Sequence, residues 1–214
     1  MRFAPAPQDP RDLSYLALRK AVGIVALLLP FAIAIPWGCA HHTILTSISI
    51  YYYTGMRNLF VGSLCAIAII MLCTRGYDWK DEAADILSGI CAIGVAFFPT
   101  APACCSSHRQ NVIGAVHYTF AALLFLTLAF FCLYLFTMSA RGRTLTSRKL
   151  QRNKVYVISG IVILISLALL ATLTLLLHRP YVFAHVAPGI CFETTSLLAF
   201  GVAWLVKGEA ILGD

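Results

Sequence analysis

Charged residues are scarce in this sequence, and their scarcity decides the broad class of protein. Asp, Glu, Lys and Arg make up only 12% of the 214 residues, while 60% are hydrophobic and the mean hydropathy is +0.83. A water-soluble domain of this length has too small a core to bury so much apolar surface. The composition therefore excludes a soluble domain and predicts an integral membrane protein.

The short motifs of common enzyme classes are also missing. The sequence contains no GxSxG, HExxH, CxxC, Walker or Rossmann glycine pattern, so no motif marks a nucleophile, a zinc site or a nucleotide site. We also expect no pair of carboxylates to share a helix face. The net charge of +7 comes without a nucleic-acid recognition motif, and nucleic acid is therefore not an expected partner.

Six apolar runs are present, and short polar connections separate them. A membrane-spanning helix needs about 20 mostly apolar residues, and shorter runs span by tilting little or by thinning the bilayer. The predicted fold class is therefore all-α, a polytopic bundle of six transmembrane helices that forms a single domain over residues 1–214. We expect spans at about residues 21–37, 58–73, 83–98, 113–138, 155–177 and 189–206.

The distribution of Lys and Arg predicts the orientation of the bundle. Short loops that stay in the cytoplasm are enriched in these residues. Thirteen of the sixteen fall in one set of alternate connections, and only Arg57, Arg109 and Arg179 fall in the other set. This asymmetry predicts that both termini are cytoplasmic, and it supports an even number of spans. We interpret the basic segment 141–154 as a topology determinant rather than as a headgroup-binding patch.

The first apolar run has an alternative interpretation. Residues 32–34, Ala-Ile-Ala, follow a basic start and resemble a signal-peptide cleavage site. The basic region and the apolar run are both longer than those of a usual signal peptide. We therefore interpret residues 21–37 as a span.

Four of the eight cysteines fall on or near the expected outer side, namely Cys39, Cys104, Cys105 and Cys191. A disulfide forms there only if the compartment is oxidising. Adjacent cysteines rarely bond each other, so a bridge from Cys104 or Cys105 to Cys39 or Cys191 is the pairing to test. Bridge geometry is demanding, and spacing alone does not choose between these pairs.

Four ionisable side chains lie within or at the edges of the expected spans, where charges are costly and often mark a site. Asp85 lies near the cytoplasmic start of the third span, where an acidic group complements the positive end of the helix dipole. That structural interpretation is sufficient for Asp85. Arg57, His117 and Glu193 each lie within about one turn of the outer end of a span, so they are expected to share one layer. A guanidinium next to a carboxylate satisfies both charges, and a histidine adds a titratable group.

The connection that returns to the membrane at residues 47–58 adds hydroxyl and amide groups to this layer. We predict an outward-facing polar pocket between spans 2, 4 and 6 that binds or senses a lipid or a small amphiphile, with membrane lipids as partners. The alternative is an interfacial aromatic belt with a structural Arg57–Glu193 pair. The predicted ligand-binding residues are Ser49, Tyr52, Tyr53, Arg57, Asn58, His117 and Glu193.

The other histidines all lie in outer connections or at their edges. Zinc would suit such ligands if the loops met, but no HxxxH or HExxH places two of them on one helical face. We therefore expect no metal or cofactor, with zinc as the alternative. These histidines are His41, His42, His108, His178 and His185.

Several segments resemble an uncharacterised family of bacterial six-span membrane proteins that carry a domain of unknown function. They are YYYTGMRNLFVG, FFPTAP, GAVHYTFAALLF and FGVAWLVKG. The resemblance extends over most of the chain. It implies a six-helix bundle in the inner membrane, and it carries no catalytic assignment.

A fainter similarity is to the ceramidase-like superfamily of membrane hydrolases, which place a Ser, an Asp and three His around zinc. Ser47 or Ser49, Asp85 and His117 are the residues that would map onto that set. Those hydrolases have seven spans and a paired-His motif on the last, whereas the sixth span here carries Glu193 and no histidine. A metal-dependent lipid hydrolase is therefore the second hypothesis. A small transporter is the third, although the sequence lacks the matched broken helices of an inverted repeat.

Overall fold

The protein is all-helical, as the sequence predicts. The structure, a computed structural model, describes residues 10–74, 78–102, 107–138, 146–173 and 188–212. Within these ranges it contains six α-helices, a 3-10 helix and π-helical segments at residues 131–135 and 172–173, and no strand. The helices are α1 (Pro10–His41), η1 (Ser49–Tyr53), α2 (Arg57–Cys73), α3 (Trp79–Phe97), α4 (His108–Phe130), its π-helical continuation η2 (Phe131–Leu135), α5 (Ser147–Ala171) and α6 (Pro188–Lys207).

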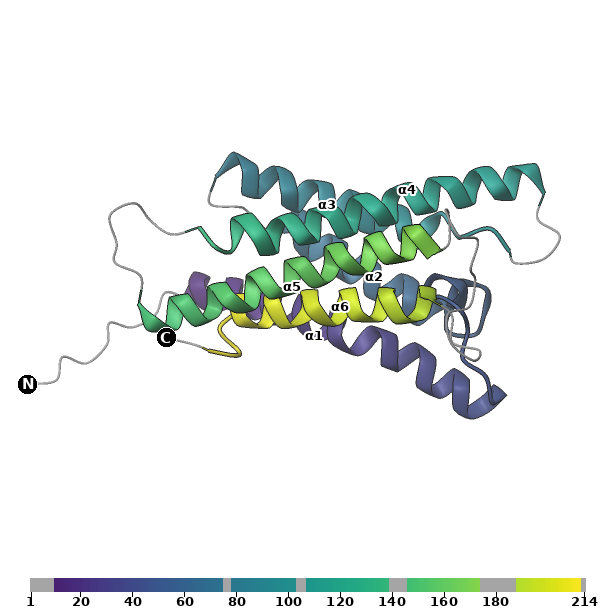
Figure 1. The fold of residues 1–214 in the computed structure, drawn as a ribbon, viewed down its shortest axis with the longest axis horizontal. Coiled ribbons are helices and arrows are strands. Elements are labelled where there is room, and N and C mark those ends of the chain that lie inside the picture. Colours follow the sequence, from purple (N-terminus) through teal and green to yellow (C-terminus); the bar gives the residue numbers. More distant parts are fainter. Residues whose placement is uncertain (1–9, 75–77, 103–106, 139–145, 174–187, 213–214) are drawn as a thin grey trace, which may run out of the picture.

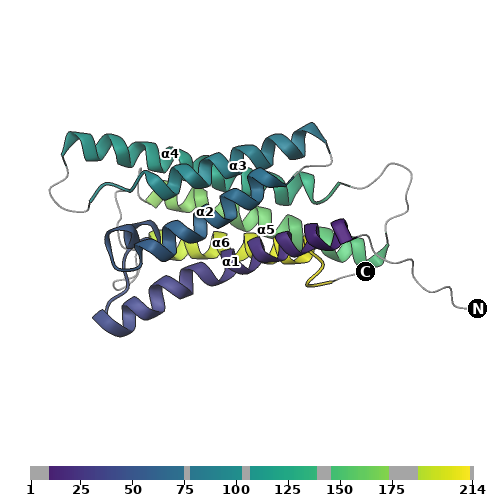
Figure 2. The same cartoon turned by 180° about the vertical axis from the view of Figure 1, so that it is seen from behind.

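The six α-helices form a closed ring. Each α-helix packs against the next one along the chain, and α6 packs against α1 to close the ring. Successive helices run in opposite directions (Figures 1 and 2). Two ends of the bundle result: α2, α4 and α6 begin at one, which we call the Glu193 end, and α1, α3 and α5 begin at the other, the Asp85 end. Gly208, just after α6, packs against Arg19 and Lys20, so α6 ends beside the N-terminal third of α1.

Several helices extend beyond the apolar runs that predict them. The added turns begin at polar caps, whose side chains accept hydrogen bonds from backbone N–H groups of the first turn. Asp78 caps α3, Ser107 caps α4 in a capping box with Gln110, and Thr146 caps α5. Hydropathy records only the apolar part of a helix, which explains why the observed starts precede the predicted ones.

Close packing joins α1 to α6 at a pair of glycines. A Cβ added at Gly201 would lie 2.9 Å from the carbonyl oxygen of Gly23, and one added at Gly23 would lie 3.0 Å from that of Gly201. Small residues at such a contact let two helix backbones approach closely, which is a common way to pack helices in a membrane. The glycine pair therefore sets the distance between the helices that close the ring.

Large apolar side chains also cover the outside of the bundle. On α1 they recur at Ile24, Leu28, Phe31 and Ile35, all of which are exposed. Four helices are long and apolar enough to cross a membrane, at Tyr15–His41, His108–Leu135, Ser147–Ala171 and Pro188–Lys207. An outward apolar face on such helices is typical of a membrane protein, in which lipid covers that face. The shorter α2 is also apolar, and α3 carries four charged residues in its first two turns.

Candidate functional site

The connection between α1 and α2 lies on the first turns of α6, and Glu193 holds it there. The Glu193 carboxylate accepts hydrogen bonds from the Ser47 hydroxyl, at 2.7 and 3.0 Å, and from the backbone N–H of Ile48 at 2.7 Å. The N–H of Ile190 also donates to the carbonyl of Thr46 at 2.8 Å. Hydrogen bonds to a carboxylate are stronger than those between neutral groups. Glu193 therefore contacts this connection, as expected, and its hydrogen bonds attach the connection to α6.

Arg57 does not take part in that contact. Its guanidinium donates to the Tyr52 hydroxyl at 2.6 Å and lies over the Tyr52 ring, 4.3 Å from the centroid. The Arg57 side chain is exposed, and within the described residues no ion pair joins it to Glu193. The expected Arg57–Glu193 pair therefore does not form, because Glu193 finds its donors in the loop and Arg57 points to the surface.

His117 lies apart from both. It is only 2% exposed, and its Nδ1 lies 2.6 Å from the carbonyl oxygen of Phe98, directly after α3. The last carbonyl groups of a helix have no partner within the helix. His117 therefore joins the start of α4 to the end of α3, and the layer expected for Arg57, His117 and Glu193 is divided among three separate contacts.

The seven predicted ligand-binding residues fall into two groups. His117 and Glu193 hold backbone groups of another segment in place. Ser49 lies inside the loop that Glu193 anchors, where its N–H donates to the Ser47 hydroxyl at 3.1 Å. The other four gather at the start of α2 and reach the surface to different degrees. We call this group, which consists of Tyr52, Tyr53, Arg57 and Asn58, the α2 patch.

The α2 patch surrounds an open helix N-terminus. Met56, the N-cap residue, makes no side-chain cap, and the first turn holds no acidic side chain. The tyrosines beside it are fixed: the Tyr53 hydroxyl donates to the carbonyl of Thr100 at 2.6 Å, and the two rings meet edge to face at 5.4 Å. Partial burial, and then Tyr52, raise the pKa of the Tyr53 phenol, which stays a neutral donor. A helix N-terminus without a side-chain cap and an exposed guanidinium together favour an anion.

No metal cluster is found among the residues that the structure describes, where no three His, Cys, Asp or Glu side chains lie close enough to share an ion. The His41 ring stacks on Trp37 at 3.6 Å. His178 and His185 lie outside the described residues, as do Cys104 and Cys105. Cys39 and Cys191 are free.

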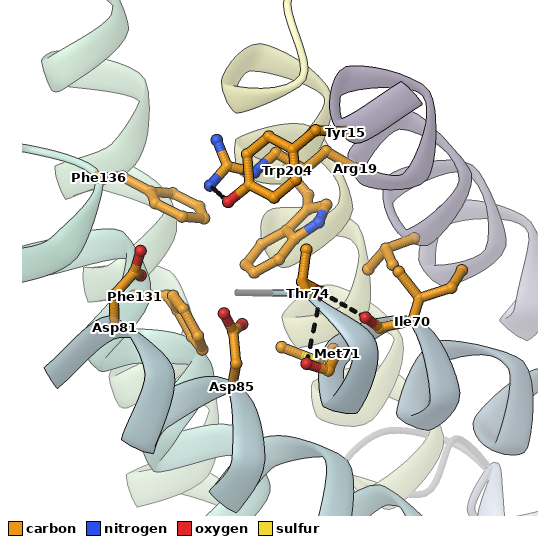
Figure 3. A pocket seen from close by; sticks show the side chains of 11 residues that line it. Tyr15, Arg19, Ile70, Met71, Thr74, Asp81, Asp85, Phe131, Phe136 and Trp204 are labelled. Carbon is orange, nitrogen blue, oxygen red and sulfur yellow. Dashed lines mark hydrogen bonds between the residues drawn. The ribbon is translucent and has the colours of Figure 1, made fainter. Parts of the chain in front are cut away.

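A second polar site lies at the Asp85 end (Figure 3), inside the ring where α1, α2, α3, η2 and α6 meet. Arg19, Asp81 and Asp85 line a small cavity there and are only 8%, 8% and 5% exposed. The cavity volume of about 10 Å³ gives room for about one water molecule. Aromatic side chains form much of its remaining wall, namely Tyr15, Phe131, Phe136 and Trp204.

The sequence contained a signal for this second site, which the helix-dipole interpretation of Asp85 overlooked. Asp81 and Asp85 are four residues apart and therefore lie on one face of α3. Both are buried, so the expectation that no two carboxylates share a helix face is wrong. The burial of Arg19 had no comparable signal, because its charge was already explained by membrane topology.

Comparisons with known proteins do not place this chain in a family, since no family model, curated protein or solved structure matches it. The function proposed below is therefore argued from the geometry of the two sites.

Proposed function

We propose that this chain is a six-span protein of the cytoplasmic membrane, with both termini inside, and that its α2 patch binds the phosphate of a phospholipid in the outer leaflet. The closed ring of alternating helices supports six spans, because α2 and α3 complete the ring between α1 and α4. The charge distribution supports the orientation, since thirteen of the sixteen Lys and Arg residues belong to connections at the Asp85 end.

The observation that carries the lipid proposal is the combination of an exposed guanidinium with an uncapped helix N-terminus. Arg57 is the first residue of α2, and the hydrogen bond from its guanidinium to Tyr52 holds the side chain beside a first turn that has no side-chain cap. The N–H of Arg57 itself donates to the carbonyl of Thr54 at 3.1 Å, so a ligand would use the N–H groups that follow it. Phosphate oxygens accept hydrogen bonds from both kinds of donor. Tyrosines are typical of the membrane interface, where lipid phosphates lie.

The proposed ligand site is smaller than the pocket expected from the sequence. It lies on η1 and α2, and it does not use His117 or Glu193, whose polar atoms are engaged with backbone groups. The ligand class remains a membrane lipid, and the lipid is recognised through its phosphate.

Native mass spectrometry of the detergent-purified protein tests this proposal. The probes are phosphatidylglycerol and a diacylglycerol with the same chains, which lacks the phosphate. We expect the intact protein to retain phosphatidylglycerol preferentially. Arg57→Ala should weaken that retention about tenfold, because a charge-assisted hydrogen bond contributes roughly 1.5 kcal/mol or more.

Arg109→Ala is the matched control. Arg109 is also exposed, and it lies in the first turn of α4 at the same end of the bundle. The N-terminus of α4 differs from that of α2 because the Ser107–Gln110 capping box satisfies N–H groups there. This variant should retain phosphatidylglycerol like the unmodified chain. Equal losses in the two variants, or no loss in Arg57→Ala, would contradict phosphate binding at the α2 patch.

A further inference from the structure

The Asp85 carboxylate is buried without a hydrogen-bond donor from the described part of the chain. It is 5% exposed, and no described residue donates a hydrogen bond to it or forms an ion pair with it. Arg19 is close enough to interact electrostatically, but its guanidinium donates to the Tyr15 hydroxyl and lies over the Tyr15 ring. Buried polar groups are almost always paired. An unpaired buried carboxylate therefore requires an explanation other than packing.

The carboxylate points into the cavity. In Figure 3 its oxygens face the open space between Phe131, Trp204 and Thr74. The Thr74 hydroxyl is already engaged, because it donates to the carbonyl groups at Ile70 and Met71. The space admits about one water molecule, and its apolar walls offer few oxygen atoms.

We propose that Asp85 is a proton-binding site that water reaches through this cavity from the Asp85 end of the bundle. The step is balanced: a hydronium ion gives one proton to the carboxylate, which leaves a neutral carboxylic acid and one water molecule. Protonation removes a charge that is costly to keep in a low-dielectric site without a donor. The new O–H group also provides a donor for the water in the cavity.

A metal cation fits the cavity less well than a proton. Sodium or calcium requires several oxygen ligands, while the cavity offers the Asp81 and Asp85 carboxylates among mostly aromatic and aliphatic walls. The guanidinium of Arg19 also lines it, and this positive charge opposes a second cation. A proton needs only one oxygen and a path for water.

The charges around Asp85 come from several helices. Tyr15 and Arg19 face it from α1, and Asp81 faces it from its own helix. On α6, Lys207 lies near Arg19 and Asp81, and the α5 cations Lys149 and Arg152 act on Lys207. The side chains that α2, its C-cap residue and η2 contribute to the cavity carry no charge. They are Ile70, Met71, Thr74 and Phe131.

This inference goes beyond lipid binding and is independent of it, because the two sites lie at opposite ends of the bundle. pH-difference infrared spectroscopy of the full-length protein in lipid tests it. We expect a carboxylic-acid C=O band to appear as the pH is lowered and to shift in deuterated water, which would show that water reaches the site. Asp85→Asn should lose the part of this band that Asp85 contributes, measured as the difference from the unmodified protein.

Glu82→Gln is the matched control, since Glu82 lies on the same turn of α3 with an exposed side chain. It should keep the band. Asp85→Glu retains a carboxyl and should move the band rather than abolish it, which keeps the test decisive if Asp85→Asn does not fold. If the band in Asp85→Asn had the same intensity as in the unmodified protein, or if the Asp85 component did not change with pH or did not shift in deuterated water, the proposal would be overturned.

Discussion

At the scale of single residues, the buried polar side chains of this bundle divide by what they bond. Glu193 and His117 each engage backbone groups of another element, at 2.7 Å and 2.6 Å, and so hold two segments together. Asp85 has no such partner among the residues that the structure describes, and it faces a cavity. Ionisable groups within apolar runs often mark a site, which is why Glu193 and His117 were predicted to bind a ligand. The sequence does not distinguish an ionisable group that bonds backbone from one that has no partner. That distinction depends on contacts between residues far apart in the chain.

Glu193→Gln should loosen the connection between α1 and α2. A neutral amide accepts weaker hydrogen bonds than a carboxylate and directs its NH2 group at donors, so we expect a loss of roughly 1.5 to 3 kcal/mol in local stability. Hydrogen exchange over residues 45–54 measures this loss and should become about tenfold faster or more.

The control for that variant is Glu82→Gln at the other end of the bundle, which should leave exchange over residues 45–54 unchanged. Ser47→Ala removes only the hydroxyl donor and should have a smaller effect than Glu193→Gln. If exchange in Glu193→Gln matched that of the unmodified chain, Glu193 would not be the group that anchors this loop.

At the scale of elements, hydropathy located all six helices, and polar caps decided where several of them begin. The start of α4 shows the difference: the apolar run begins at about residue 113, but the capping box begins the helix at His108. The cap could have been recognised from Ser107 and Gln110 three residues apart. The short π-helix η2, which lines the Asp85 cavity, had no signal in the sequence.

The packing of α1 against α6 gives a prediction at this scale. Gly201→Ala places a methyl group 2.9 Å from the carbonyl oxygen of Gly23 and closer still to the Leu27 side chain, so the two helices must separate. We expect a loss of about 1 to 3 kcal/mol, typical of overpacking. A thermal melt of the purified protein should show a clearly lower midpoint.

Gly62→Ala is the comparison, because a Cβ at Gly62 meets nothing within 4 Å. Ala is the better helix former by about 1 kcal/mol, so this variant should melt at the same temperature or slightly higher. A Gly201→Ala protein as stable as Gly62→Ala would mean that the glycine pair does not set the spacing of α1 and α6.

At the scale of the whole molecule, the sequence predicted an all-helical membrane protein for a physical reason: so much apolar surface requires lipid. It predicted seven residues as one layer, and the structure distributes them between a surface patch and backbone contacts. Depth along a helix can be counted from the sequence, but the direction in which a side chain points depends on how the helices pack. The order in which the helices pack around the ring determines which side chains face each other.

Both proposed sites depend on α2 crossing the membrane. It has 17 residues, a length of about 25 Å at 1.5 Å per residue, against a hydrocarbon core of about 30 Å, so the bilayer must thin slightly around it. Asn58, in the first turn of α2, and Glu82, which follows α2 in the first turn of α3, are both exposed and lie at opposite ends of α2. They are therefore suitable positions for reporting the two faces of the membrane.

Labelling with a membrane-impermeant maleimide tests the orientation and both sites together. In a chain whose native cysteines are replaced, Asn58→Cys should be labelled in intact cells, and Glu82→Cys should be labelled only in inverted vesicles. That result places the α2 patch outside and the Asp85 cavity inside. Labelling of both positions from the same side would show that α2 does not span the membrane, and labelling in the reverse sense would contradict the proposed orientation.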